Sequence, residues 1–101
     1  MNEGKITIRI DPDIADLIPG FLKNREEDIT QITKCLDKND FETIERLGHS
    51  MKGAGAGYGF DGITEIGLTI EKAAKQKDVT AIKKSLKELE TYLKQVVIVN
   101  E

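Results

Sequence analysis

The chain has little cysteine and little histidine: each occurs once in 101 residues, as Cys35 and His49. A single cysteine cannot form a disulfide within the chain, which favours a reducing compartment. One histidine with one cysteine also lacks the spacing of a metal site, which needs several convergent ligands, so no metal site is predicted. Cys35 is interpreted as a half-buried helix residue rather than a nucleophile, because no catalytic pairing with a second residue can be argued.

Long hydrophobic runs and an excess of positive charge are absent as well. No apolar run approaches the length of a membrane span, and the opening MNEGKITIRI lacks the apolar core of a signal peptide. Lys and Arg number 15 against 18 Asp and Glu, a formal net charge of −3. Non-specific binding to nucleic acid or to anionic membranes requires a basic surface. We therefore expect a soluble, cytoplasmic protein that binds neither of these and meets another protein or a small ligand.

The length is sufficient for one domain with a single core that needs neither disulfides nor metal. Residues 5–10, KITIRI, alternate isoleucine with polar residues, as does a strand with one buried face. The β-like counterpart is VVIV at residues 96–99. Two arrangements stay open: a small pairing of these segments, or an extended arm that lies along the rest of the fold.

Between these segments the sequence predicts a short helix and four long ones. Asp11 followed by Pro12 is typical of a helix start, and about two turns of amphipathic helix follow. Pro19 either begins the next helix, which runs to about Lys38, or breaks the first. Apolar residues three and four positions apart mark the five helices in turn: Ile14, Leu17 and Ile18; Leu22, Ile29, Ile32 and Leu36; Phe41, Ile44, Leu47 and Met51; Ile63, Ile66, Ile70 and Ala73 or Ala74; Val79, Ile82, Leu86, Leu89, Leu93 and Val96.

Four long apolar stripes joined by short turns predict an all-α fold, an antiparallel up-down four-helix bundle. Asp40 and Asp78 are the expected N-caps of the second and fourth long helices, and the third is expected from near Asp61 to about Lys77. A short additional N-terminal helix and a short extended N-terminal arm complete the expected architecture. We expect the arm at residues 1–10 and the bundle domain at residues 11–101.

His49 faces away from the apolar stripe of its predicted helix. A helix turns by about 100° per residue, which sets the imidazole about 170° from the centre of that stripe. The ring is therefore expected to face water, with Lys52 beside it and Gly53 next to both. A buried core histidine is disfavoured by this position, whereas a surface histidine without function and an ordinary solvated lysine stay open as alternatives.

Glycine is abundant on the same helix, at Gly48, Gly53, Gly55, Gly57 and Gly59. Each costs roughly 0.5–1 kcal/mol relative to alanine in a helix interior. Two benefits can offset this cost: close approach of a neighbouring helix, or an open surface beside the imidazole, which is the role expected of Gly53. The alternative is a frayed or broken helix. The run is no nucleotide-binding loop, since no Gly-Lys-Ser or Gly-Lys-Thr follows it.

The segment HSMKGAGAGYG, residues 49–59, resembles the signature of histidine phosphotransfer (HPt) domains. In that signature a lysine follows the histidine by three residues, a glycine comes next, and another glycine stands six further on. His49, Lys52, Gly53 and Gly59 match these positions, although the run is denser in glycine than is usual in the family. The resemblance covers nearly the whole chain, because the family is an antiparallel four-helix bundle with a short helix over one end and the histidine midway along the second long helix.

The resemblance implies a phosphorelay intermediate of two-component signalling, in which His49 accepts a phosphoryl group and exchanges it with an aspartate of a response-regulator receiver domain. A neutral imidazole offers a nucleophilic nitrogen near physiological pH, and phosphoryl transfer needs positioning and charge neutralisation more than covalent machinery. Lys52 can bring its ammonium group close to the phosphate. The attacking atom should be Nε2, which lies furthest from the helix, so that Nδ1 carries the proton and needs an acceptor.

Glu71, at the border of the next apolar stripe, is the candidate acceptor. In the family that resembles this chain, a residue at that offset, often glutamine and sometimes glutamate, contacts the ring. We hypothesise that Glu71 orients His49, fixes its tautomer and raises the electron density at Nε2. The alternative is an ordinary exposed glutamate paired with Lys75 one turn along.

Nothing in the chain resembles an ATP-binding kinase domain or a receiver, so we expect a phosphocarrier, not an enzyme. The partner, a response-regulator receiver domain or a histidine kinase, would supply the aspartate, the Mg²⁺ and most of the catalysis, and this chain would bind no cofactor and be a monomer. The receiver is expected to dock over the small residues Gly53 and Ala56, rimmed by Lys52, Glu45 and Arg46.

Two other functional classes stay open. A helical interaction module with the same bundle would signal by binding alone, with His49 incidental. A small enzyme with His49 as general base is disfavoured, because the sequence shows neither a pocket nor a cluster of carboxylates around the histidine.

Overall fold

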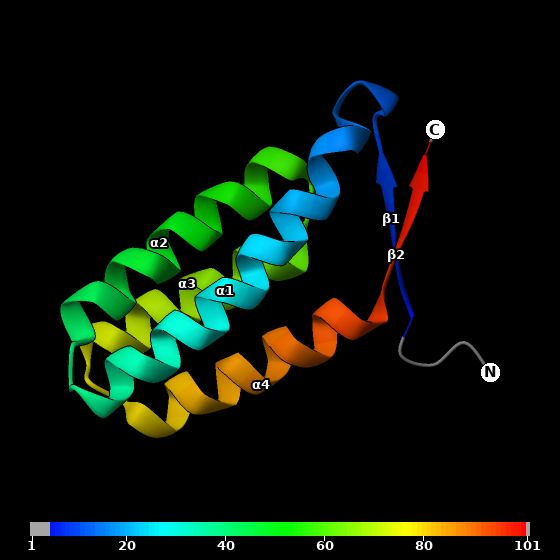
Figure 1. The fold of residues 1–101 in the computed structure, drawn as a ribbon. Helices are drawn as coiled ribbons and strands as arrows, with labels where there is room; N and C mark the ends of the chain where they lie inside the picture. The colour runs from blue at the N-terminus through cyan, green and yellow to red at the C-terminus, as the bar shows by residue number, and fades with distance from the viewer. Residues whose placement is uncertain (1–4, 101) are drawn as a thin grey trace.

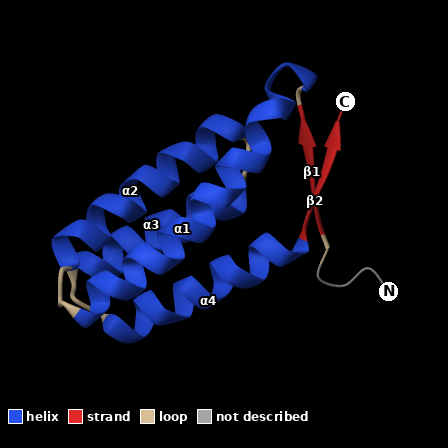
Figure 2. Cartoon of the chain, in the orientation of Figure 1, coloured by secondary structure: helices blue, strands red, loops and turns tan. Residues whose placement is uncertain are grey.

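The computed structural model describes residues 5–100, in which four long helices lie together as a bundle and two short strands stand at one end (Figure 1). Helix accounts for nearly all of the chain between the strands, as the colouring by secondary structure shows (Figure 2). In chain order the elements are β1 (Ile6–Ile10), the 3-10 helix η1 (Pro12–Leu17), α1 (Ile18–Asp37), α2 (Phe41–Tyr58), α3 (Asp61–Lys75), α4 (Val79–Gln95) and β2 (Val96–Asn100).

The starts of α2 and α4 follow from caps that the sequence predicts. The side chain of Asp40 accepts a hydrogen bond from the backbone N–H of Thr43 at the start of α2, and Asp78 accepts one from Ala81 at the start of α4. Helix α2 ends at Gly59, whose φ of 81° lies in the left-handed region that glycine adopts without steric cost. The predicted caps are thus confirmed, and the glycine-rich helix continues unbroken to Tyr58.

The segment before α1 differs from the sequence prediction. Asp11 starts it as expected, accepting a hydrogen bond from the backbone of Asp13, but the segment is a 3-10 helix that ends at Leu17. Pro19 lies in the first turn of α1, so it begins this helix rather than breaking the one before it. Leu17 was predicted to lie on an apolar stripe, yet its side chain is exposed at the junction between the two helices.

The core is aliphatic and draws on all four helices. Its most deeply buried members include Ile32, Ile44, Ile70, Ile82 and Leu89, one or more from each helix. The apolar stripe predicted for the last helix was wrong at its first position, Val79. Helix α4 begins at this residue, at the end of the bundle, and the valine side chain is exposed. From the next predicted position onward the stripe faces the core.

Strands β1 and β2 form a two-stranded parallel sheet, with Ile6 opposite Val96 and Ile10 opposite Asn100. Parallel neighbours need a long crossover connection, and here the whole bundle is that crossover. The pairing was one of the two arrangements left open, and it replaces the lone extended arm expected at residues 1–10, of which residues 1–4 lie outside the described residues. Ile10 is 1% exposed and belongs to the core, so the sheet closes one end of the bundle.

The two faces of β1 should respond differently to substitution. We expect Ile10→Ala to lower the free energy of unfolding by about 2–5 kcal/mol, because it removes buried methyl groups and leaves a cavity. Thr7→Ala, on the exposed face of the same strand, should change it by less than about 0.5 kcal/mol. Urea denaturation followed by circular dichroism measures both. Equal effects of the two substitutions would contradict the docking of β1 on the core.

Candidate functional site

Helices α2 and α3 touch backbone to backbone because glycines face each other. A Cβ added to Gly48 would lie 2.7 Å from the backbone nitrogen of Glu71 and 2.9 Å from the carbonyl oxygen of Gly67. A Cβ added to Gly67 would lie 2.5 Å from the backbone nitrogen of Lys52. No side chain fits at either position without moving a backbone. The close approach brings Glu71 of α3 within reach of the side chains on the outer face of α2.

A second contact fixes the same two helices one turn further along. Gly55 lies against Thr64, whose hydroxyl donates a hydrogen bond of 3.2 Å to the carbonyl oxygen of Lys52. The glycines of α2 therefore include both kinds that the sequence suggests: those that allow close approach of a neighbouring helix and those that leave an open surface. Gly48 and Gly55 admit the neighbouring helix, whereas a Cβ on Gly53 would meet no atom within 4 Å.

His49 projects from α2 with 66% of its side chain exposed. Its Nδ1 lies 2.9 Å from Oε2 of Glu71, which is only 12% exposed. The ring is thus held on one side by a largely buried carboxylate, and Nε2 lies on the opposite side of the ring. A shallow hollow beside the ring is lined by Glu42, Glu45 and Arg46 together with His49 and Glu71.

Glu71 also accepts a hydrogen bond of 3.0 Å from Nζ of Lys52, through its other oxygen, Oε1. That hydrogen bond is the main reason why the pKa of Glu71 lies below its ordinary value; burial opposes the shift, and the contact with His49 adds to it. The carboxylate is therefore ionised at physiological pH. The alternative partner considered for Glu71, Lys75, lies instead 3.9 Å from a carboxylate oxygen of Glu45.

The structure thus brings three of the predicted site residues into one cluster, His49, Lys52 and Glu71. Gly53 and Ala56 are exposed on the same helix. Sequence reasoning missed the bond between Lys52 and Glu71 and the part played by Gly67. The sequence did contain a signal for the contact between Lys52 and Glu71, since both residues were expected to lie beside the imidazole of His49.

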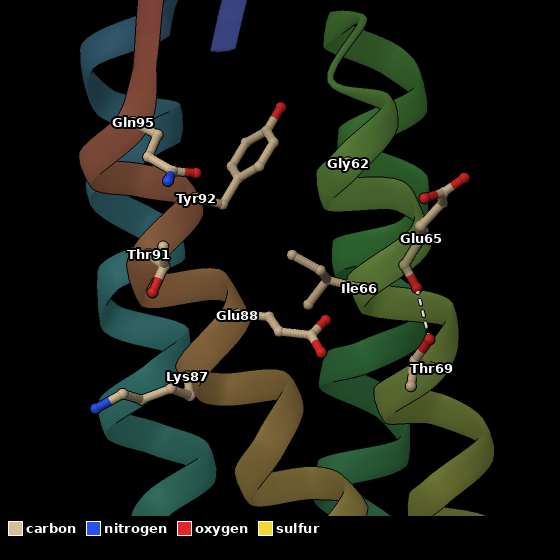
Figure 3. Close-up of a pocket in the computed structure, with 9 residues that line it drawn as sticks. All are labelled: Gly62, Glu65, Ile66, Thr69, Lys87, Glu88, Thr91, Tyr92 and Gln95. Carbon is tan, nitrogen blue, oxygen red and sulfur yellow. Dashed lines mark hydrogen bonds between the residues drawn. The ribbon is translucent and has the colours of Figure 1, made fainter. Parts of the chain in front are cut away.

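A second hollow, of about 490 Å³, lies between α3 and α4 and includes none of these residues (Figure 3). Its floor is formed by Ile66 and Tyr92, and the ring of Tyr92 packs against Gly62. The tyrosine hydroxyl is buried and has no hydrogen-bond partner among the described residues. Neither histidine nor cysteine lines this hollow.

Residues 5–100 show neither a metal-binding cluster nor a membrane-spanning helix. They hold no group of three or more His, Cys, Asp or Glu side chains that could bind a metal ion. Within the same range, no helix combines the length and the apolar character that crossing a membrane requires.

The sequence matches a known protein family. The family model of the Hpt domain matches residues 16–97. The chain belongs to the Hpt domain family. Hpt domains are histidine phosphotransfer modules of two-component signalling, so the resemblance carried by residues 49–59 is confirmed. Comparisons with curated proteins and with solved structures gave no match.

Two glycines of this Hpt domain should respond in opposite directions to a single methyl group. We expect Gly48→Ala to lower the free energy of unfolding by about 1–3 kcal/mol, because its Cβ meets the backbone of α3. Gly53→Ala should raise it by about 0.5–1 kcal/mol, since open space surrounds that position and alanine favours the helix. Urea denaturation of both variants is the measurement. A stabilising Gly48→Ala would refute the backbone contact between α2 and α3.

Proposed function

We propose that this Hpt domain is a phosphorelay intermediate: Nε2 of His49 accepts a phosphoryl group from an aspartate of a response-regulator receiver domain and can return it. The observation that carries the proposal is the contact between an exposed imidazole and a largely buried carboxylate, 2.9 Å apart, on a family-matched helix bundle. The same bundle without phosphoryl chemistry would be an interaction module, and that remains the alternative outcome of the test.

The contact with Glu71 supports Nε2 as the nucleophile. An ionised carboxylate only accepts hydrogen bonds, so Nδ1 must carry the proton in the neutral ring. The lone pair then resides on Nε2, on the side of the ring that a partner can reach. Glu71 acts here through His49 and is a positioning residue, as carboxylates bound to histidine are elsewhere.

Transfer moves one electron pair at each end of the phosphoryl group. The Nε2 lone pair forms the N–P bond, the P–O bond to the receiver's aspartate breaks, and its electron pair stays on the aspartate oxygen. Lys52 lies in the same cluster and supplies an ammonium group that can neutralise phosphate charge. Mg²⁺ belongs, in this proposal, to the partner receiver, which also supplies most of the catalysis.

The docking surface follows from the small residues beside the ring. Gly53 and Ala56 are exposed and leave α2 without bulky side chains at this point, so a receiver can bring its aspartate close to His49. Contacts between transient signalling partners are small, and we expect weak, rapidly exchanging binding by a monomer. With a single cysteine, the protein is proposed to act in the reducing cytoplasm.

The finer architecture belongs to the same proposal. Only three residues separate α1 from α2 and α3 from α4, and only two separate α2 from α3. Connections this short join neighbouring helices that run in opposite directions. We therefore assign the up-down antiparallel order to the bundle, with η1 as the short helix that the family carries before it.

The direct test is phosphoryl transfer from a receiver. The protein is mixed with receiver domains from the same genome that have been phosphorylated with acetyl phosphate, and we expect acid-labile, alkali-stable label to appear on it. His49→Gln should abolish the label, because the amide offers no nucleophilic nitrogen. Label that persists in this variant would place the phosphate elsewhere. Binding to a receiver without any label on the unaltered protein would favour the interaction module.

Transfer kinetics test the role of Lys52. We expect Lys52→Gln to slow transfer by about tenfold, corresponding to about 1.4 kcal/mol of lost charge neutralisation in the transition state. Lys84→Gln, an exposed lysine on α4, is the matched control and should leave the rate unchanged. Single-turnover transfer from phosphorylated receiver measures both. An unchanged rate in Lys52→Gln would remove that side chain from the mechanism.

A further inference from the structure

The carboxylate of Glu71, which contacts Nδ1 of His49, accepts hydrogen bonds and cannot donate one at physiological pH. An ionised carboxylate has lone pairs on both oxygens and no proton to give. Lys52 occupies Oε1 of Glu71 with a hydrogen bond of 3.0 Å, and only Oε2 faces the ring. The same hydrogen bond holds the pKa of Glu71 below its ordinary value, which keeps the carboxylate ionised. In the unphosphorylated ring this suits Nδ1, which donates.

Phosphorylation changes what the ring requires at Nδ1. Once the Nε2 lone pair has formed the N–P bond, the ring carries phosphorus on Nε2 and a proton on Nδ1, and is therefore a positively charged imidazolium. To become neutral it must release the Nδ1 proton. The released state would set a lone pair of Nδ1 against a lone pair of Oε2 across 2.9 Å, with no hydrogen between them. Glu71 therefore opposes release of that proton.

The other charged groups near the ring do not replace this contact. From α2 and α3 they are Glu42, Glu45, Arg46, Lys52 and Lys75. Lys75 and Glu45 face each other at 3.9 Å, and Lys52 is directed to Glu71. Among the described residues, Glu71 is thus the carboxylate that touches Nδ1.

On the basis of the function proposed above, we propose that Glu71 keeps the phosphorylated ring of His49 protonated on Nδ1 throughout the physiological pH range. The protonated ring is the better leaving group, because the electron pair of the breaking N–P bond returns to a positive ring and makes it neutral. Transfer in either direction then exchanges no proton with water. The carboxylate makes this Hpt domain a carrier that passes its phosphoryl group on, rather than one that stores it.

Glutamine is the variant that isolates this effect. Glu71→Gln has nearly the same shape, but its one carbonyl oxygen can accept either from Nδ1 of His49 or from Nζ of Lys52, and not from both. After phosphorylation the amide can turn its NH₂ group toward Nδ1 and donate, so the ring can lose its proton. The variant keeps the size of the side chain and removes both its negative charge and the constraint on protonation of Nδ1. Glu42→Gln, which removes a carboxylate from the same hollow without touching the ring, is the control for general charge.

The test is a pH titration of the phosphorylated ring by NMR. The protein is labelled with ¹⁵N-histidine, phosphorylated with phosphoramidate, and followed from about pH 6 to about pH 10. We expect the unaltered protein and Glu42→Gln to retain the Nδ1 proton to a pH at least about one unit higher than Glu71→Gln, a difference of about tenfold in proton affinity. The phosphohistidine of Glu71→Gln should also outlive that of the unaltered protein several-fold at about pH 8.5.

Coinciding titration curves for the unaltered protein and Glu71→Gln would overturn the inference. A ring that phosphoramidate does not phosphorylate would overturn it too, because Nε2 would then not be an available nucleophile. Phosphoramidate needs no protein partner, so the result is independent of transfer from a receiver. Separated titrations with no transfer from any receiver would contradict the proposed relay alone, whereas transfer with coinciding titrations would contradict the role of Glu71 alone.

Discussion

The contact between the backbones of α2 and α3 at Gly48 and Gly67 is the constraint on which the site depends. No side chains separate the two helices at this point, so their axes lie closer together than usual. The carboxylate of Glu71 on α3 can therefore reach the imidazole of His49, which points outward from α2. Glycine weakens a helix interior, and here the loss is offset by packing against the neighbour. Gly48 and Gly55 are therefore requirements of the packing between α2 and α3 rather than signs of a poorly formed helix.

The cluster divides its members between the interior and the solvent. Glu71 is largely covered and accepts two hydrogen bonds, Lys52 is partly covered, and His49 is mostly exposed. A largely covered ionised carboxylate needs partners for its charge, and the two α2 side chains provide them. The ring is thus anchored through Nδ1 on its covered side, and Nε2 is left on the exposed side.

The sequence predicts most of this arrangement because helical periodicity and caps are local signals. The apolar stripes and the aspartate caps place α2, α3 and α4 to within about two residues, and the phase of α2 puts His49 in solvent. The partner of Glu71 was harder to predict, because Lys75 lies one turn away on the same helix whereas Lys52 is 19 positions distant and reaches it only through the close approach of two helices. Long-range contacts of this kind are set by packing, which a single sequence does not display.

Strand pairing was the least predictable feature for the same reason. Alternation marks residues 6–10 as a strand, but neither the partner nor the parallel direction can be deduced from it, since both depend on where the bundle returns the chain. The family match begins at residue 16, so β1 lies before it. Its buried isoleucine joins the common core, which means that the sheet packs on the bundle at a place away from the exposed face of α2 that holds His49. A bundle stabilised away from this face can accept a helix as rich in glycine as α2, and the imidazole of His49 is left exposed with open space beside it at Gly53.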